Sequence, residues 1–135
     1  MNSKEQSRSK FALDSIENLT KKTGKVSEDF ANFIVGTPTM ILQNGLGQTM
    51  AFLLSKCKGA KEFTDKHYFT YQAIAKWCKR QNEKISDEPH NFFSGISELP
   101  QNEYLMLQEE ALKMLQWLKR YARAFQEVTD NESAE

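Results

Sequence analysis

Four side chains in this sequence are of the types that bind zinc: Cys57, His67, Cys78 and His90. Structural zinc sites normally pair their ligands two to four residues apart, and none of these four residues has a second one that close. The spacing therefore predicts no metal centre, and His67 is interpreted as a core residue on an apolar helix face. Two cysteines are too few for a disulfide scaffold, so we expect reduced thiols.

Neither the carboxylates nor the glycines form a catalytic pattern. Glu109 and Glu110 are neighbours in a predicted helix, where side chains diverge by about 100°, so they cannot act as one acid/base pair. Residues 45–49 contain two glycines but lack the Gly-Lys-Ser/Thr ending of a phosphate loop. No nucleophile motif is present. The sequence predicts a protein that is not an enzyme and needs no cofactor.

The cations offer a different kind of chemistry. Eighteen basic residues balance 18 acidic ones, but the two signs are segregated along the chain, which allows a basic face without a basic pI. Residues 113–123 hold four basic side chains and no acidic one. Lys113 can pair with Glu109, and Arg123 with Glu127, but Lys119 and Arg120 have no acid at i±4. From the residues alone, a solvated charged face is the favoured interpretation.

The elements that must position these cations are predicted to be helices, because no alternating β-branched run occurs. A first helix ends near Gly24, and Ser27 caps a short helix that ends at Gly36. Pro38 begins another helix, which stops at Asn44-Gly45. Further helices are expected over residues 47–57, 63–82, 91–99 and 101–127. The predicted fold is all-α, a compact single-domain bundle of five to seven helices with two long helices.

Residues 31–55 contain no charged side chain, in a chain that is 27% charged. A membrane span needs about 20 consecutive, mostly apolar residues, and polar side chains such as Gln43, Asn44 and Gln48 interrupt this segment. It is therefore interpreted as the core of a compact domain, with Phe52 and Leu53 buried.

The two long helices present side chains off their apolar stripes. In the last helix, Leu105 and Leu112 lie beside the stripe and are candidates for protein contact, although single exposed leucines are common. In the central helix, Phe69 lies beside Lys66 and Lys76, an arrangement that suits base stacking with phosphate contact. Burial of Phe69 under another helix is the favoured alternative, because large aromatic side chains usually bury their area.

The length of 135 residues fits one domain. We expect a helical domain over residues 1–127, with residues 1–8 flexible, and an acidic flexible tail over residues 128–135. Residues 1–10 are polar and contain no apolar segment of a secretory signal. A cytoplasmic protein without membrane association is therefore expected.

Two blocks of the sequence resemble a known family, the small helical subunit of the type III-B CRISPR effector, the Cmr complex (its fifth subunit). The first block is Pro38 followed by Asn44-Gly45-Leu46-Gly47-Gln48-Thr49-Met50-Ala51-Phe52-Leu53-Leu54-Ser55-Lys56. The second comprises Tyr104, Ala111-Leu112 and Trp117-Leu118-Lys119-Arg120-Tyr121-Ala122. The first 30 residues and the acidic tail show no such resemblance.

The resemblance implies a non-catalytic subunit of an RNA-guided, RNA-targeting ribonucleoprotein. Copies would stack into a filament beside other Cmr subunits and line the channel that holds guide and target RNA. On this basis RNA contact is favoured over a solvated face. The candidate RNA-binding residues are Lys56, Lys119, Arg120 and Arg123, followed by Lys76 and Arg80.

Two other functions remain open at this stage. One is a protein-only scaffold or adaptor that docks through Leu105, Leu112 and Phe69, with the cations incidental. The other is a DNA-binding regulator, which needs a polar recognition helix. The helix predicted over residues 47–57 is too apolar to read bases.

Overall fold

The computed structural model describes residues 3–57, 62 and 64–127. Within these residues the chain forms six α-helices and no strand, which confirms the predicted all-helical class. Their bounds are α1 Lys4–Thr23, α2 Glu28–Asn44, α3 Leu46–Lys56, α4 Lys66–Gln81, α5 Pro89–Glu98 and α6 Gln101–Ala124. Residues 4–8, inside the segment expected to be flexible, form the start of α1. The acidic tail expected over residues 128–135 lies outside the described residues.

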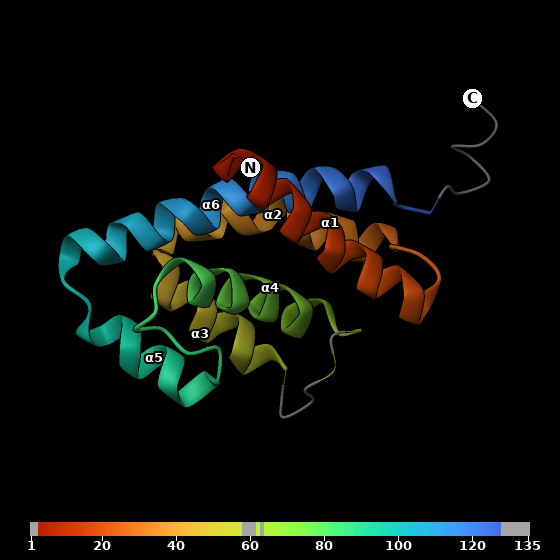
Figure 1. Cartoon of the computed structure of the whole chain (residues 1–135). Helices are drawn as coiled ribbons and strands as arrows, with labels where there is room; N and C mark the ends of the chain where they lie inside the picture. The colour runs from red at the N-terminus through yellow and green to blue at the C-terminus, as the bar shows by residue number, and fades with distance from the viewer. Residues whose placement is uncertain (1–2, 58–61, 63, 128–135) are drawn as a thin grey trace.

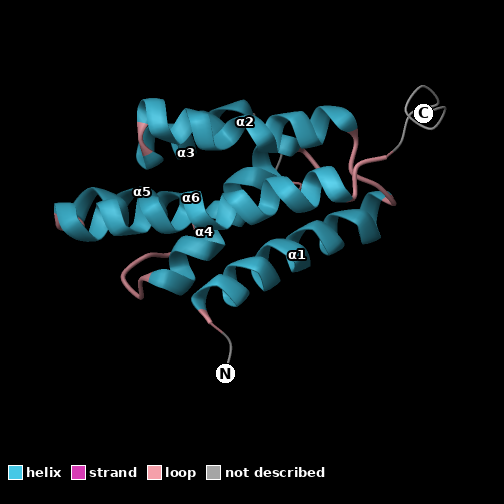
Figure 2. Cartoon of the chain, turned by 90° about the horizontal axis from the view of Figure 1, so that it is seen from above, coloured by secondary structure: helices cyan, strands magenta, loops and turns pink. Residues whose placement is uncertain are grey.

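The helices form two layers. α6 lies between α1 and α2 in one layer, and α4 and α3 lie beneath it with α5 at one end (Figures 1 and 2). α6 contacts α1, α2 and α4, so it is the central element of the bundle. α1 packs mainly against α6 and contacts α4 much less. None of the described helices is long and apolar enough to cross a membrane.

The predicted helix ends are largely present. Gly24 follows α1 with φ 83°, a left-handed conformation that glycine adopts readily. The hydroxyl of Ser27 accepts the Phe30 N–H at 3.1 Å and so caps α2. Local capping chemistry is therefore sufficient to locate these boundaries.

The predicted break at Gly36 is wrong, because α2 continues through Gly36 and Pro38 to Asn44. Pro38 has no N–H to donate to the Ile34 carbonyl, a loss that normally disrupts a helix interior. Here Thr37 and Pro38 are buried on the same face as Ile34 and Ile41, and the Thr37 hydroxyl donates to the Phe33 carbonyl at 2.9 Å. Burial of this face outweighs the local cost of the proline.

The two family-like blocks meet where α2 turns into α3. α3 has no side-chain cap of its own. Instead, the Tyr104 hydroxyl of α6 accepts the Gly47 N–H, and the Gln108 carbonyl oxygen accepts the Leu46 N–H, both at 2.8 Å. These bonds satisfy free N–H groups at the helix start. Much of the first block therefore has a structural explanation that does not involve a ligand.

We expect Gly45→Ala to lower the free energy of unfolding by about 1–3 kcal/mol, because φ 86° and ψ 163° lie in a region that is essentially restricted to glycine. Gly36→Ala is the matched control. Gly36 lies exposed in α2 with space for a methyl group, so the same substitution should stabilise by about 0.5–1 kcal/mol. Urea unfolding followed by circular dichroism measures both values. Equal effects would contradict the strain at Gly45.

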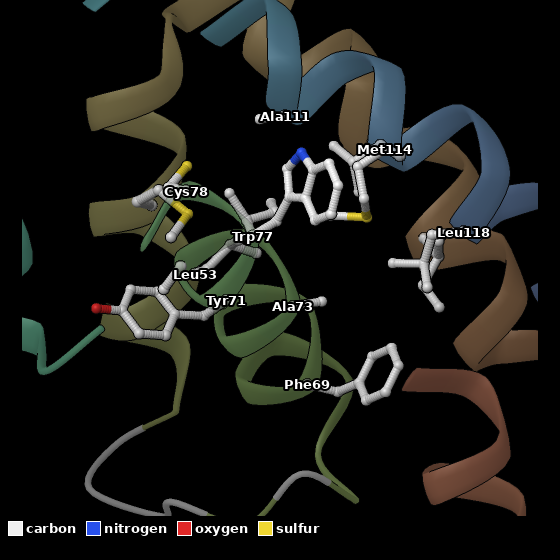
Figure 3. Close-up of a cluster of buried hydrophobic side chains, with 14 of the residues drawn as sticks. Leu53, Phe69, Tyr71, Ala73, Trp77, Cys78, Ala111, Met114 and Leu118 are labelled. Carbon is white, nitrogen blue, oxygen red and sulfur yellow. The ribbon is translucent and has the colours of Figure 1, made fainter. Parts of the chain in front are cut away.

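The core lies between α4, α3 and α6. Trp77 of α4 reaches toward α6, where Met114 lies beside its ring and Leu118 follows farther along the helix, and Leu53 approaches from α3 (Figure 3). The predicted burial of Leu53 is confirmed, since it is fully buried. The predicted burial of Phe52 is wrong, because 40% of it is exposed. Side chains at adjacent helix positions point about 100° apart. A helical segment without charged residues can therefore still leave some of its apolar side chains exposed.

Phe69 is buried rather than exposed. It was a candidate for surface contact, but only 4% of it is exposed, and its ring packs edge-on against Phe30 with centroids 5.3 Å apart. α4 packs against α1, α2, α3 and α6, and its Tyr71 packs on Phe92 of α5, so its buried face is wider than the single arc that periodicity assigns. The favoured alternative, burial of Phe69, is correct.

Candidate nucleic-acid interface

The groups that could perform acid, metal or thiol chemistry lie apart. Among the described residues no three His, Cys, Asp or Glu side chains form a metal-binding group. His67 is partly buried and its Nδ1 lies 3.4 Å from a carboxylate oxygen of Asp65. Burial, and secondarily Asp65, raises the pKa of the Cys57 thiol, and burial raises that of Cys78 to about 12. Both cysteines are buried free thiols, so neither is a reactive thiolate at neutral pH.

The first group of candidate cations lies on α6. Met114 and Leu118 face the core, and Arg120, two residues beyond Leu118, therefore projects from the far side of the helix. Arg120 and Arg123 are exposed, and Lys119 is half-buried. We name Lys119, Arg120 and Arg123 the α6 cations.

Ion pairing distinguishes the α6 cations from their neighbour. Lys113 pairs with Glu109 at 3.0 Å, as the i,i+4 spacing predicts. Arg123 does not use Glu127: it donates to the Gln126 carbonyl oxygen at 2.8 Å, and Glu127 pairs with Lys25 instead. Within the described part of the chain, no carboxylate pairs with Lys119, Arg120 or Arg123. Their charges are available to an anionic partner.

The second group, Lys76 and Arg80, lies on α4 beside a groove of about 590 Å³ between α1 and α4. Lys21 and Lys22 of α1 line the same groove. Sequence reasoning did not single out these two lysines, because basic residues in the last turn of a helix are explained by the helix dipole. Only the packing of α1 beside α4 places them in the same groove as Lys76 and Arg80.

Lys56 lies apart from both groups, in the last turn of α3. Its ammonium lies 5.5 Å from the centroid of the Phe52 ring, one turn earlier. The exposed Phe52 therefore has a cation over its face.

The candidate protein-contact residues also differ in exposure. Leu105 is 50% exposed and Leu112 is only partly buried, packed against the core. Leu42, 71% exposed on α2, and Met106, 67% exposed on α6, are further exposed apolar side chains, which the sequence did not mark as contact residues. Their apolar character gave no signal of exposure, because hydrophobic sequence patterns do not show which face remains uncovered.

Fold and surfaces together define a small all-helical protein with cationic surfaces and no catalytic cluster in its described part. The chain matches the family model described as "CRISPR-associated protein (Cas_Cmr5)" over residues 4–125. Since the match spans nearly the whole chain, the protein belongs to this family, the small, non-catalytic helical subunit of the type III-B Cmr complex.

Proposed function

We propose that this subunit contacts the backbone of RNA bound by the Cmr effector, through the α6 cations. The observation that supports this best is that Lys119, Arg120 and Arg123 share one side of α6 without a carboxylate partner in the described chain, whereas Lys113, earlier on the same helix, has one. Cations on a rigid helix neutralise phosphates and release their counterions. In an RNA-guided complex, base pairing supplies the sequence specificity, so the protein needs backbone contacts rather than base readers.

The proposed setting is the cytoplasm, in an assembly with other Cmr subunits, guide and target RNA, and further copies of this chain in a filament. Leu105 is the better candidate for a subunit contact, because it is half exposed, whereas Leu112 is partly covered by its own domain. Lys56 remains a secondary RNA candidate at the end of α3. The alternative function is a protein-only scaffold, in which the same apolar residues dock and the cations are incidental.

Replacing both Lys119 and Arg120 with alanine should weaken binding of target RNA about equally for any guide sequence, because phosphates carry no sequence information. The slope of log K against log salt should fall in magnitude by about 1.4 per engaged subunit copy, at about 0.7 per lost contact to single-stranded RNA. The measurement is a salt titration of target binding by the assembled complex.

Lys113→Ala is the control, since it also removes an exposed charge from α6 but one that Glu109 already pairs. It should leave the slope nearly unchanged. If the double variant enters the complex at normal stoichiometry and both affinity and slope match the parent, the protein-only scaffold is the better description.

A further inference from the structure

The α1–α4 groove is built from two helices that run in opposite directions. Lys4 at the start of α1 donates to Gln81 at the end of α4, and Arg80 lies over Phe11 of α1. Phe69, near the start of α4, and Lys21, near the end of α1, line the same groove. Its volume of about 590 Å³ lies within the range of about 300–1,000 Å³ typical of ligand sites.

The groove is strongly basic. Lys21, Lys22, Lys76 and Arg80 line it, and Asp14 is the acidic residue in its lining. The Asp14 carboxylate is already paired with Lys10 at 2.9 Å. Lys21, Lys76 and Arg80 have no carboxylate partner in the described part of the chain. Arg80 and Lys21 lie toward opposite ends of antiparallel walls, so an anion with charges spaced along its length fits better than a single compact ion.

The residues that line the groove also suit the planar ring of a nucleobase. The Arg80 guanidinium lies 4.9 Å from the Phe11 ring centroid, and Phe11 in turn packs on Trp77 at 5.1 Å. This contact orients the exposed guanidinium, a planar cation on which a nucleobase stacks favourably. Asn18, Ser15 and Gln72 add hydrogen-bonding groups between the charged ends. Gln72 donates its NH₂ to the Tyr68 hydroxyl at 2.7 Å.

We propose that the α1–α4 groove binds an unpaired stretch of RNA, with phosphates on Lys21, Lys76 and Arg80 and a base stacked on the Arg80 guanidinium. This inference rests on the proposed function, because it takes RNA as the ligand, but it assigns a second surface with a different preference. A base can stack on the Arg80 guanidinium only when it is free of a duplex, because the bases of a duplex stack on one another. The groove therefore selects single strands, whereas the α6 cations contact the backbone.

The test uses the full chain at 50 mM salt and measures fluorescence anisotropy with a labelled 12-nucleotide single-stranded RNA and with the same RNA annealed to its complement. The parent should bind the single strand more tightly. Lys76→Gln combined with Arg80→Gln should weaken single-strand binding about tenfold or more, from lost stacking and phosphate contacts, and leave duplex binding within about twofold. Arg80→Lys keeps the positive charge but removes the planar guanidinium on which a base stacks. It should therefore remove most of the preference for single-stranded RNA.

Lys79→Gln is the matched control on the same helix. Lys79 pairs with Asp87 at 3.5 Å and does not line the groove, so its loss should change neither affinity by more than about twofold. Thermal unfolding of each variant distinguishes loss of binding from loss of folding. Because Lys76 and Arg80 are exposed, we expect their replacement to leave the unfolding temperature nearly unchanged.

Three results would overturn the inference: no single-strand preference in the parent, equal weakening of single-strand and duplex binding by the groove variant, or equal weakening toward a 12-residue polyglutamate, which would indicate a general anion surface. The outcome is separable from the proposed function. If the groove variant binds single-stranded RNA like the parent while the Lys119→Ala/Arg120→Ala complex binds target RNA more weakly, the groove proposal alone is rejected. If the groove variant loses single-strand binding while the Lys119→Ala/Arg120→Ala complex binds target RNA normally, the α6 proposal alone is rejected.

Discussion

Arg8→Ala is expected to lower the free energy of unfolding by about 3–5 kcal/mol, because it leaves a mostly buried carboxylate without its partner. Arg8 of α1 forms a two-pronged pair with Glu110 of α6: Nε and Nη2 each donate to one carboxylate oxygen at 2.8 Å. The side chains are only 10% and 15% exposed. Trp77 of α4 also donates to Glu110, at 3.3 Å. The pair therefore joins three helices, and its loss should loosen α1.

Urea unfolding measures this effect, with Lys10→Ala as the control, since the Lys10–Asp14 pair lies exposed within α1 and should contribute less than about 0.5 kcal/mol. The double variant Arg8→Met/Glu110→Leu should be more stable than either charge-removing single variant, because no unpaired charge is buried. Single variants as stable as the parent would show that the pair contributes little.

The Arg8–Glu110 pair also makes the free energy of unfolding depend on pH. Hydrogen bonds from Arg8, and its charge, hold the pKa of Glu110 below its usual value in spite of burial. A carboxyl group whose folded pKa is lowered contributes stability that is complete above its unfolded pKa of about 4.3 and is lost as pH falls through the folded value. On acidification below that pH, the parent should therefore lose more stability than the double variant, which lacks this carboxyl group; urea unfolding of both proteins at several pH values measures the two losses.

Leu53→Ala is expected to cost about 2–5 kcal/mol, from lost burial and from the cavity left behind. Leu53 is fully buried where α3 meets α4 (Figure 3). Leu42→Ala is the matched control: it removes the same atoms from an uncharged part of the sequence, but Leu42 is mostly exposed, so its effect should stay within about 0.5 kcal/mol.

Phe52→Ala should fall between these two, at about 1–2 kcal/mol, because part of the ring is already in water. Thermal or urea unfolding of the three variants under one set of conditions gives the order. If Phe52→Ala destabilised the protein as much as Leu53→Ala, the exposed placement of Phe52 would be contradicted.

Sequence alone was sufficient for the features that depend on a few neighbouring residues. Ser27 and Gly24 define helix ends through bonds to groups one turn away, and the stripe of α6 that contains Met114 and Leu118 follows from helical periodicity. The family-like blocks could be identified in the same way, since they are local strings of residues. The break predicted at Gly36 failed because local helix-breaking residues were overridden by burial of the surrounding face.

Only the tertiary structure decided which residues from distant parts of the chain come together. Tyr104 caps α3 from α6, Phe69 is covered by Phe30, and Lys21 lines a groove with Arg80. Each of these depends on how helices rotate and cross when they pack, which is set by the fit of whole faces. The sequence therefore determined that this protein is a helical bundle with segregated charges, and packing determined which of those charges share a surface.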